Sequence, residues 1–137
     1  MSGRRRFAAS LPAAAAIVVV SVFAACAGSN DDWVACTEEA RASVMVSVVD
    51  AVGSPLAGAV VTYLVNGVQP GTAECADPST PAAQCSLFVA GYELAGAFEI
   101  AATRGGYRTA RANVEVPMDE AGCHVVTRQV TLQLFPG

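Results

Sequence analysis

Five cysteines and one histidine carry the most reactive side chains of this sequence. The cysteines are Cys26, Cys36, Cys75, Cys85 and Cys123, and the histidine, His124, directly follows the last of them. No two cysteines have the Cys-x-x-Cys spacing of common zinc sites, so a metal site would need ligands scattered along the chain. We therefore expect neither a metal site nor another cofactor, and we interpret the cysteines as disulfide partners.

Cys123 and His124 could together form a nucleophile and its general base. Adjacent residues of a β-strand, however, point to opposite faces of the sheet, and a disulfide at Cys123 would remove the thiol altogether. We expect His124 to lie at the end of a strand and to face solvent or a neighbouring side chain. The sequence also lacks the Gly-x-Ser-x-Gly motif of many serine hydrolases. These observations predict that the chain is not an enzyme.

Cys26 follows a segment with the features of a secretion signal. Residues 4–6 are three arginines, residues 7–25 carry no charge, and the middle of this stretch is strongly apolar. A basic start, an apolar stretch and small residues before the cleavage site are typical of a secretory signal peptide. We therefore predict a signal peptide over residues 1–25, which places the rest of the chain outside the cytoplasm.

Residues 23–26 read Phe-Ala-Ala-Cys and resemble the lipobox of bacterial lipoproteins. The resemblance implies that Cys26 receives fatty acids such as palmitate, becomes the first residue of the mature protein and anchors it to a membrane of the bacterial cell envelope. Two alternatives remain open. An ordinary signal peptidase could cleave around residues 25–27 and release a secreted protein, or the segment could remain as a membrane-spanning helix of about 20 residues.

Without Cys26, four cysteines remain, an even number that suits an oxidising compartment. Four cysteines allow three pairings. We favour Cys75–Cys85, which would close an irregular loop, and Cys36–Cys123, which would tie the start of the domain to the start of its last strand. By the loop-closure argument such bridges stabilise a small domain by roughly 3 to 5 kcal/mol each.

The charge of the exported part limits its partners. Residues 26–137 contain five arginines and all 12 acidic residues, so their formal charge is −7. Nucleic acids and anionic lipids are bound by basic surfaces, and we therefore expect no nucleic-acid partner. Three of the arginines, Arg108, Arg111 and Arg128, could form a local positive patch, although protection of exposed sheet edges is the commoner role of such residues.

The pattern of the exported part predicts short β-strands. Valines 44, 46 and 48 alternate with other residues, and a run of turn-forming residues follows at 50–55. Residues 58–65 are apolar on both faces, which indicates a central strand, and Asn66-Gly67 is a strong turn signal. Residues 70–83, with three prolines, predict a loop. The pattern of strands resumes at 85–90, 96–103, 107–116 and 124–134, a spacing typical of a β-sandwich.

Two segments resemble the carboxypeptidase regulatory-like domains of exported bacterial proteins. Residues 50–61 read Asp-x-x-Gly-x-Pro-Leu-x-Gly-Ala-x-Val, and residues 96–102 read Gly-x-Phe-x-Ile-x-Ala, followed by Gly106-Tyr107. The resemblance implies an all-β fold, a single antiparallel seven-stranded sandwich of the transthyretin-like (prealbumin-like) kind, with Phe98 and Tyr107 between the sheets. The expected organisation is a signal peptide (1–25), a tether and start of the domain (26–41) and the sandwich (42–137).

Domains of this family are not themselves catalytic and usually accompany a catalytic or transport domain. We therefore expect an envelope-anchored, non-catalytic lipoprotein that acts as a binding or structural accessory module. Its partners would be the membrane, through the lipid on Cys26, and an envelope protein or glycan. Two alternatives remain. The chain could be a carbohydrate- or small-ligand-binding surface module, which an aromatic strip on one sheet face would favour, or the regulatory subunit of a separate exported hydrolase.

Overall fold

The computed structural model describes residues 34–137, so the predicted signal peptide (1–25), the lipidation of Cys26 and the first part of the tether lie outside the described residues. Residues 34–137 form eight β-strands and one short 3-10 helix, and none of their helices is long and apolar enough to cross a membrane. The elements are β1 (Ala42–Val49), β2 (Val60–Val65), β3 (Gln69–Thr72), β4 (Glu74–Cys75), η1 (Ala82–Gln84), β5 (Leu87–Tyr92), β6 (Gly96–Thr103), β7 (Ala110–Val116) and β8 (Arg128–Gln133).

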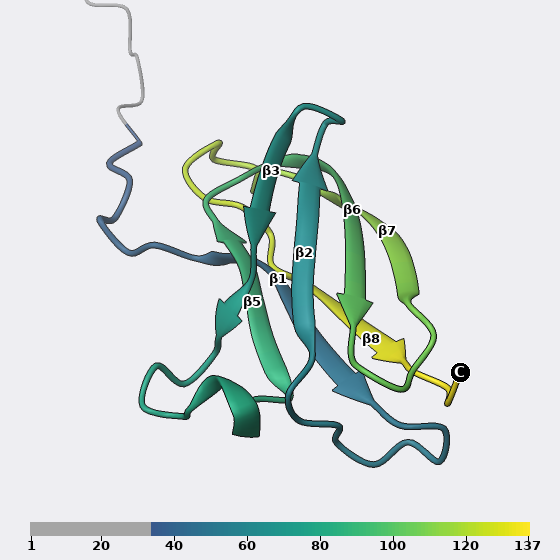
Figure 1. Cartoon of the computed structure of the whole chain (residues 1–137). Helices are drawn as coiled ribbons and strands as arrows, with labels where there is room; N and C mark the ends of the chain where they lie inside the picture. The colour runs from purple at the N-terminus through teal and green to yellow at the C-terminus, as the bar shows by residue number, and fades with distance from the viewer. Residues whose placement is uncertain (1–33) are drawn as a thin grey trace, which may run out of the picture. The chain divides into compact units, whose positions relative to one another are not determined.

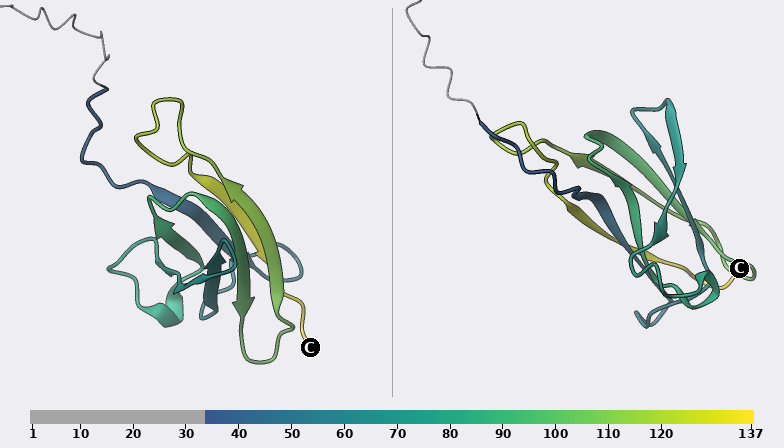
Figure 2. Two further views of the ribbon diagram at one scale, coloured as in Figure 1. Left: turned by 90° about the horizontal axis from the view of Figure 1, so that it is seen from above. Right: turned by 90° about the vertical axis from the view of Figure 1, so that its left-hand side faces the viewer.

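The strands form two sheets that pack face to face (Figures 1 and 2). The first sheet, sheet A, has the order β4-β5-β1-β8, and the second, sheet B, has the order β3-β2-β6-β7. The expected all-β class is therefore confirmed. The sheets differ from a wholly antiparallel seven-stranded arrangement, because there are eight strands and because β1 and β8 run parallel, with Val46 opposite Val130.

The additional strands come from the segment that we expected to be a loop. Residues 69–72 pair with β2 in sheet B, and after Ala73 the chain passes to sheet A, where Glu74 and Cys75 pair with β5. Pro70 is tolerated in β3 because this strand lies at the edge of its sheet, where one side of the backbone needs no partner. Only the part beyond Cys75, which includes η1, is the irregular loop that the prolines indicated.

The core lies between the sheets and follows the predicted alternation. Val44, Val46 and Val48 of β1 are each at most 1% exposed, and Phe98 and Ile100 of β6 are both 1% exposed. Full burial of such side chains is worth about 1.5–3 kcal/mol each. Phe98 therefore lies between the sheets as expected, whereas Tyr107 is only partly buried and packs against the margin of the core.

Two turns form as their sequences predicted. Asn66 and Gly67 both have positive φ angles, +52° and +71°, the backbone signature of a tight hairpin turn, and they connect β2 to β3. In the turn after β1, the carboxylate Oδ1 of Asp50 accepts hydrogen bonds from the backbone N–H groups of Val52 (3.0 Å) and Ser54 (2.9 Å). The last strand begins at Arg128 and not at residue 124, because residues 119–127 form turns and one isolated bridge.

Candidate functional site

The four cysteines of the described chain form two disulfides, Cys36–Cys123 and Cys75–Cys85. Their Cα atoms lie 5.3 Å and 5.9 Å apart, within the usual range for bridged cysteines. This is the pairing that we favoured from the sequence. Because Cys123 is bridged, it offers no thiol to His124, and a cysteine–histidine nucleophile at this position is excluded.

His124 is buried among neighbours that the sequence did not reveal. Its imidazole Nε2 lies 2.9 Å from the hydroxyl of Thr37, and its Nδ1 lies 2.8 Å from the carboxylate Oε1 of Glu93. A hydroxyl, an imidazole and a carboxylate in this order also occur in acyl-transfer enzymes. Here the histidine is only 7% exposed, and its two hydrogen bonds join residues 37, 93 and 124, so the three side chains cross-link distant parts of the chain.

Glu93 is the centre of this cross-link. Its Oε1 also accepts a hydrogen bond from the backbone N–H of Arg41 (2.7 Å), and its Oε2 accepts one from the backbone N–H of Val125 (3.1 Å). These bonds hold the residue in the left-handed region (φ +51°), which side chains other than glycine seldom adopt. The N–H of Arg41, and then the His124 imidazole, lower the pKa of the Glu93 carboxyl below its ordinary value.

Asp119 makes further contacts in the same region. Its Oδ1 accepts a hydrogen bond from the backbone N–H of Cys123 (2.9 Å), which lowers the pKa of the carboxyl, and its Oδ2 lies 3.9 Å from the Arg41 guanidinium. We call residues 36–41, Glu93 and residues 119–125 the N-terminal clamp. Its disulfide, its Arg41–Asp119 ion pair and its hydrogen bonds fix the point at which the chain enters the sandwich.

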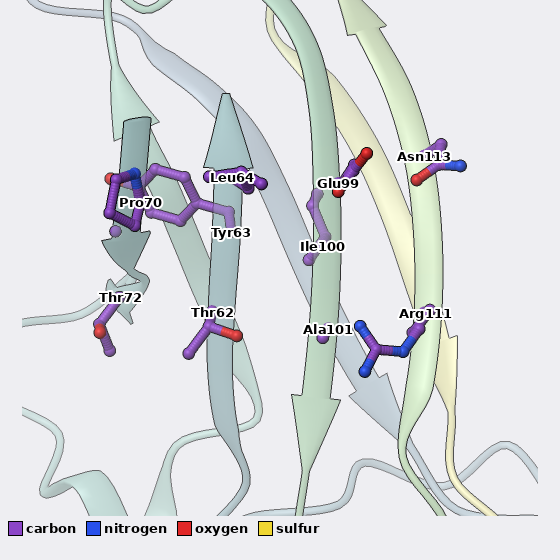
Figure 3. A pocket seen from close by; sticks show the side chains of 11 residues that line it. Thr62, Tyr63, Leu64, Pro70, Thr72, Glu99, Ile100, Ala101, Arg111 and Asn113 are labelled. Carbon is purple, nitrogen blue, oxygen red and sulfur yellow. The ribbon is translucent and has the colours of Figure 1, made fainter. Parts of the chain in front are cut away.

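A second region, on the outer face of sheet B, is hollowed (Figure 3). The hollow has a volume of about 640 Å³ and is lined by 11 residues from β2, β3, β6 and β7. The pairing register places its side chains in two rows that cross all four strands. The first row consists of Thr72, Thr62, Ala101 and Arg111, and the second consists of Pro70, Leu64, Glu99 and Asn113.

The orientation of the Tyr63 ring determines which side chains line the floor of the hollow. Tyr63 turns its ring inward, where it lies 5.7 Å from the ring of Phe98, centroid to centroid. A Cβ atom at position 71 of β3 would collide with the Tyr63 ring, so Gly71 is required there. Consequently no aromatic ring stands in either outer row, and the aromatic strip that would favour stacking of sugars is absent from these two rows of the described chain.

The three arginines of the possible positive patch have different surroundings in the structure. Arg108 lies over the ring of Phe135 at 5.9 Å, Arg128 donates a hydrogen bond to the backbone carbonyl of Glu115 (3.2 Å), and Arg111 lines the hollow. The three arginines therefore have separate neighbours. Among residues 34–137, no group of three or more histidine, cysteine or acidic side chains is arranged to hold a metal ion.

The sequence matches no protein-family model and no curated protein.

Proposed function

We propose that this chain is an exported, lipid-anchored β-sandwich module of the bacterial envelope that binds a ligand on the outer face of sheet B and catalyses no reaction. The observation that carries the proposal is the hollow on this face, where exposed polar side chains from four strands converge. Polar groups that the fold itself does not use are available to a ligand, and concave sites with a few placed polar groups are typical of ligand binding.

Export is supported by the chemistry of the cysteines. Both disulfides of the described residues belong in an oxidising compartment, which agrees with the predicted signal peptide. The pairing of the other four cysteines also leaves Cys26 as the one available for a lipid. With the lipid at Cys26, residues 26–41 would form the tether and the entry of the chain into the sandwich.

The proposed family is the carboxypeptidase regulatory-like, transthyretin-like group. The difference in strand number is small in structural terms, since β3 and β4 are two parts of one segment that changes sheet at Ala73. Counted as one strand, they give seven. The sequence motif at residues 50–61 forms the turn after β1 and the start of β2, as its glycine and proline indicated.

The anchoring part of the proposal is tested by replacement of Cys26. The Cys26→Ser variant is expected to lose both membrane attachment and incorporation of labelled palmitate, because the serine hydroxyl does not accept the lipid in place of the thiol. Fractionation of the producing cells measures both. Unchanged attachment and labelling would show that the lipoprotein assignment is wrong.

The binding part is tested by a matched pair of substitutions on the two sheets. Thr62 of β2 and Thr131 of β8 are both exposed strand threonines, but only Thr62 lines the hollow. If the outer face of sheet B binds an envelope component, the chain should still co-sediment with isolated envelopes when Cys26→Ser has removed its lipid anchor. In this background Thr62→Glu should abolish the co-sedimentation, whereas Thr131→Glu should not. Equal co-sedimentation of the two variants would contradict the assignment of binding to the outer face of sheet B.

A further inference from the structure

We propose that the hollow on sheet B binds an acidic polysaccharide through a uronic-acid carboxylate, which is held by Arg111 and Thr62 above Ala101. This inference rests on the proposed function and names its ligand. The register places the three residues side by side on β7, β6 and β2. In Figure 3 the Arg111 guanidinium extends from β7 toward Ala101 on β6, and the Thr62 hydroxyl points toward β6 from the opposite side.

The spacing suits a carboxylate and a sugar ring. Thr62 and Arg111 stand two strands apart, a separation of about 10 Å between strand axes. Ala101, between them, fills this gap with a methyl group only. The space that remains above Ala101 therefore has a cation and a hydroxyl on its two sides, and planar guanidinium groups bind carboxylates with two parallel hydrogen bonds.

Among the arginines of the described residues, Arg111 alone has no partner within that part of the chain. Within residues 34–137 its guanidinium has no carboxylate oxygen within 4.0 Å, no hydrogen bond and no aromatic ring beneath it. The other four arginines of these residues all have partners: Arg41 has Asp119, Arg104 has the ring of Tyr107, Arg108 has the ring of Phe135, and Arg128 has the carbonyl of Glu115.

The side chains of the second row favour a sugar acid as the ligand. Pro70 and Leu64 give one half of this row an apolar surface, on which the C–H face of a ring can lie. Glu99 and Asn113 form the other half and offer hydrogen-bond acceptors and an amide donor to hydroxyl groups. The Glu99 carboxylate accepts hydrogen bonds from hydroxyls but repels a second acid group, so this row favours a ring that bears one carboxylate and several hydroxyls.

The negative charge of the exported part further restricts the ligands that the hollow can bind. The exported part has a formal charge of −7, so dense polyanions such as nucleic acids are repelled at long range. The Arg111 guanidinium can still hold a single carboxylate at contact distance. We therefore infer a polymer whose carboxylates are spaced by sugar rings.

The test uses the purified full chain, carried in detergent, and three soluble probes measured by calorimetric titration. The probes are a tetramer of galacturonic acid, its methyl ester and a neutral galactose tetramer. The acid should bind, and both the ester and the neutral sugar should bind about tenfold more weakly, because they lose a charge-assisted hydrogen-bonded pair. The same loss is expected when Arg111→Met is titrated with the acid.

Arg108→Met is the matched control, since it removes the same charge from an arginine that stacks on Phe135 outside the hollow. Its affinity for the acid should equal that of the wild type. Equal binding of acid, ester and neutral sugar would overturn the assignment of a carboxylate and leave the proposed binding role intact. Binding of a peptide with a free carboxyl end in preference to every sugar would overturn the assignment of a polysaccharide.

Discussion

The N-terminal clamp and the outer face of sheet B use polar side chains in opposite ways. In the clamp, the carboxylates of Glu93 and Asp119 and the imidazole of His124 all have partners within the chain. On the outer face, the guanidinium of Arg111 has none among the described residues. The contrast separates the polar groups that hold the fold from those that remain available to a ligand. Substitutions in the first region should therefore change stability, and those in the second should change binding.

The largest effect on stability should come from the clamp disulfide. Replacing Cys36 and Cys123 by alanine opens a loop of 87 residues and should lower the free energy of unfolding by about 4–5 kcal/mol by the loop-closure argument. Urea unfolding measures this loss. The double replacement of Cys75 and Cys85, which opens a loop of ten residues, is the comparison and should cost about 3 kcal/mol. Equal losses, or a larger loss from replacing Cys75 and Cys85, would show that the clamp disulfide is not the main constraint on the chain.

A smaller loss is expected at the imidazole of the clamp. His124→Ala leaves the Glu93 carboxylate and the Thr37 hydroxyl without one partner each, and it should cost about 1–3 kcal/mol. Thr37→Val removes only the Nε2 partner at an exposed position and should cost less. If thermal unfolding places both variants at the melting temperature of the wild type, these hydrogen bonds do not hold the clamp.

The clamp should also make the protein sensitive to acid. The N–H of Arg41 lowers the pKa of Glu93 below 4.5 in the folded state. The ionised carboxylate therefore stabilises the fold fully above the unfolded pKa, and this contribution disappears as the pH falls through the folded pKa. The difference in melting temperature between wild type and Glu93→Gln should accordingly shrink as the pH is lowered from 7 to 3. A constant difference would contradict the role of the charge.

The smallest effect on stability is expected on the outer face. Thr62→Val and Asn113→Ala change exposed side chains for which the described residues provide no hydrogen-bond partner, so each should change the free energy of unfolding by less than about 0.5 kcal/mol. Urea unfolding of both variants beside the clamp variants gives the comparison directly. A loss above 1 kcal/mol would show that the side chains of this face stabilise the fold.

Local patterns in the sequence predicted much of the fold. The alternation in β1, the turn at Asn66 and the glycine–aromatic pattern of β6 depend on neighbouring residues, and each formed as expected. The pairing of β3 and β4 was missed because Pro70 and Gly71 interrupt the strand pattern, although an edge strand tolerates both. The parallel contact of β1 with β8 was missed because nothing in either strand specifies a partner so distant in the sequence.

The N-terminal clamp and the hollow on sheet B were less predictable, because their residues come together from distant parts of the sequence. His124 attracted attention as the single histidine, but its partners Thr37 and Glu93 are 87 and 31 residues away in the sequence. Arg111 was one of three arginines with no feature to rank them. Only the register, which puts Arg111 opposite Ala101 and Ala101 opposite Thr62, shows that its guanidinium has a hollow beside it.

The most direct test of the contrast is hydrogen–deuterium exchange of the full chain with and without the galacturonic acid tetramer. We expect slower exchange in the strands that border the hollow at the two edges of sheet B, β3 (Gln69–Thr72) and β7 (Ala110–Val116). We expect no change in the clamp, residues 36–41 and 119–125. Slower exchange in the clamp, with β3 and β7 unchanged, would contradict the assignment of binding to the outer face of sheet B.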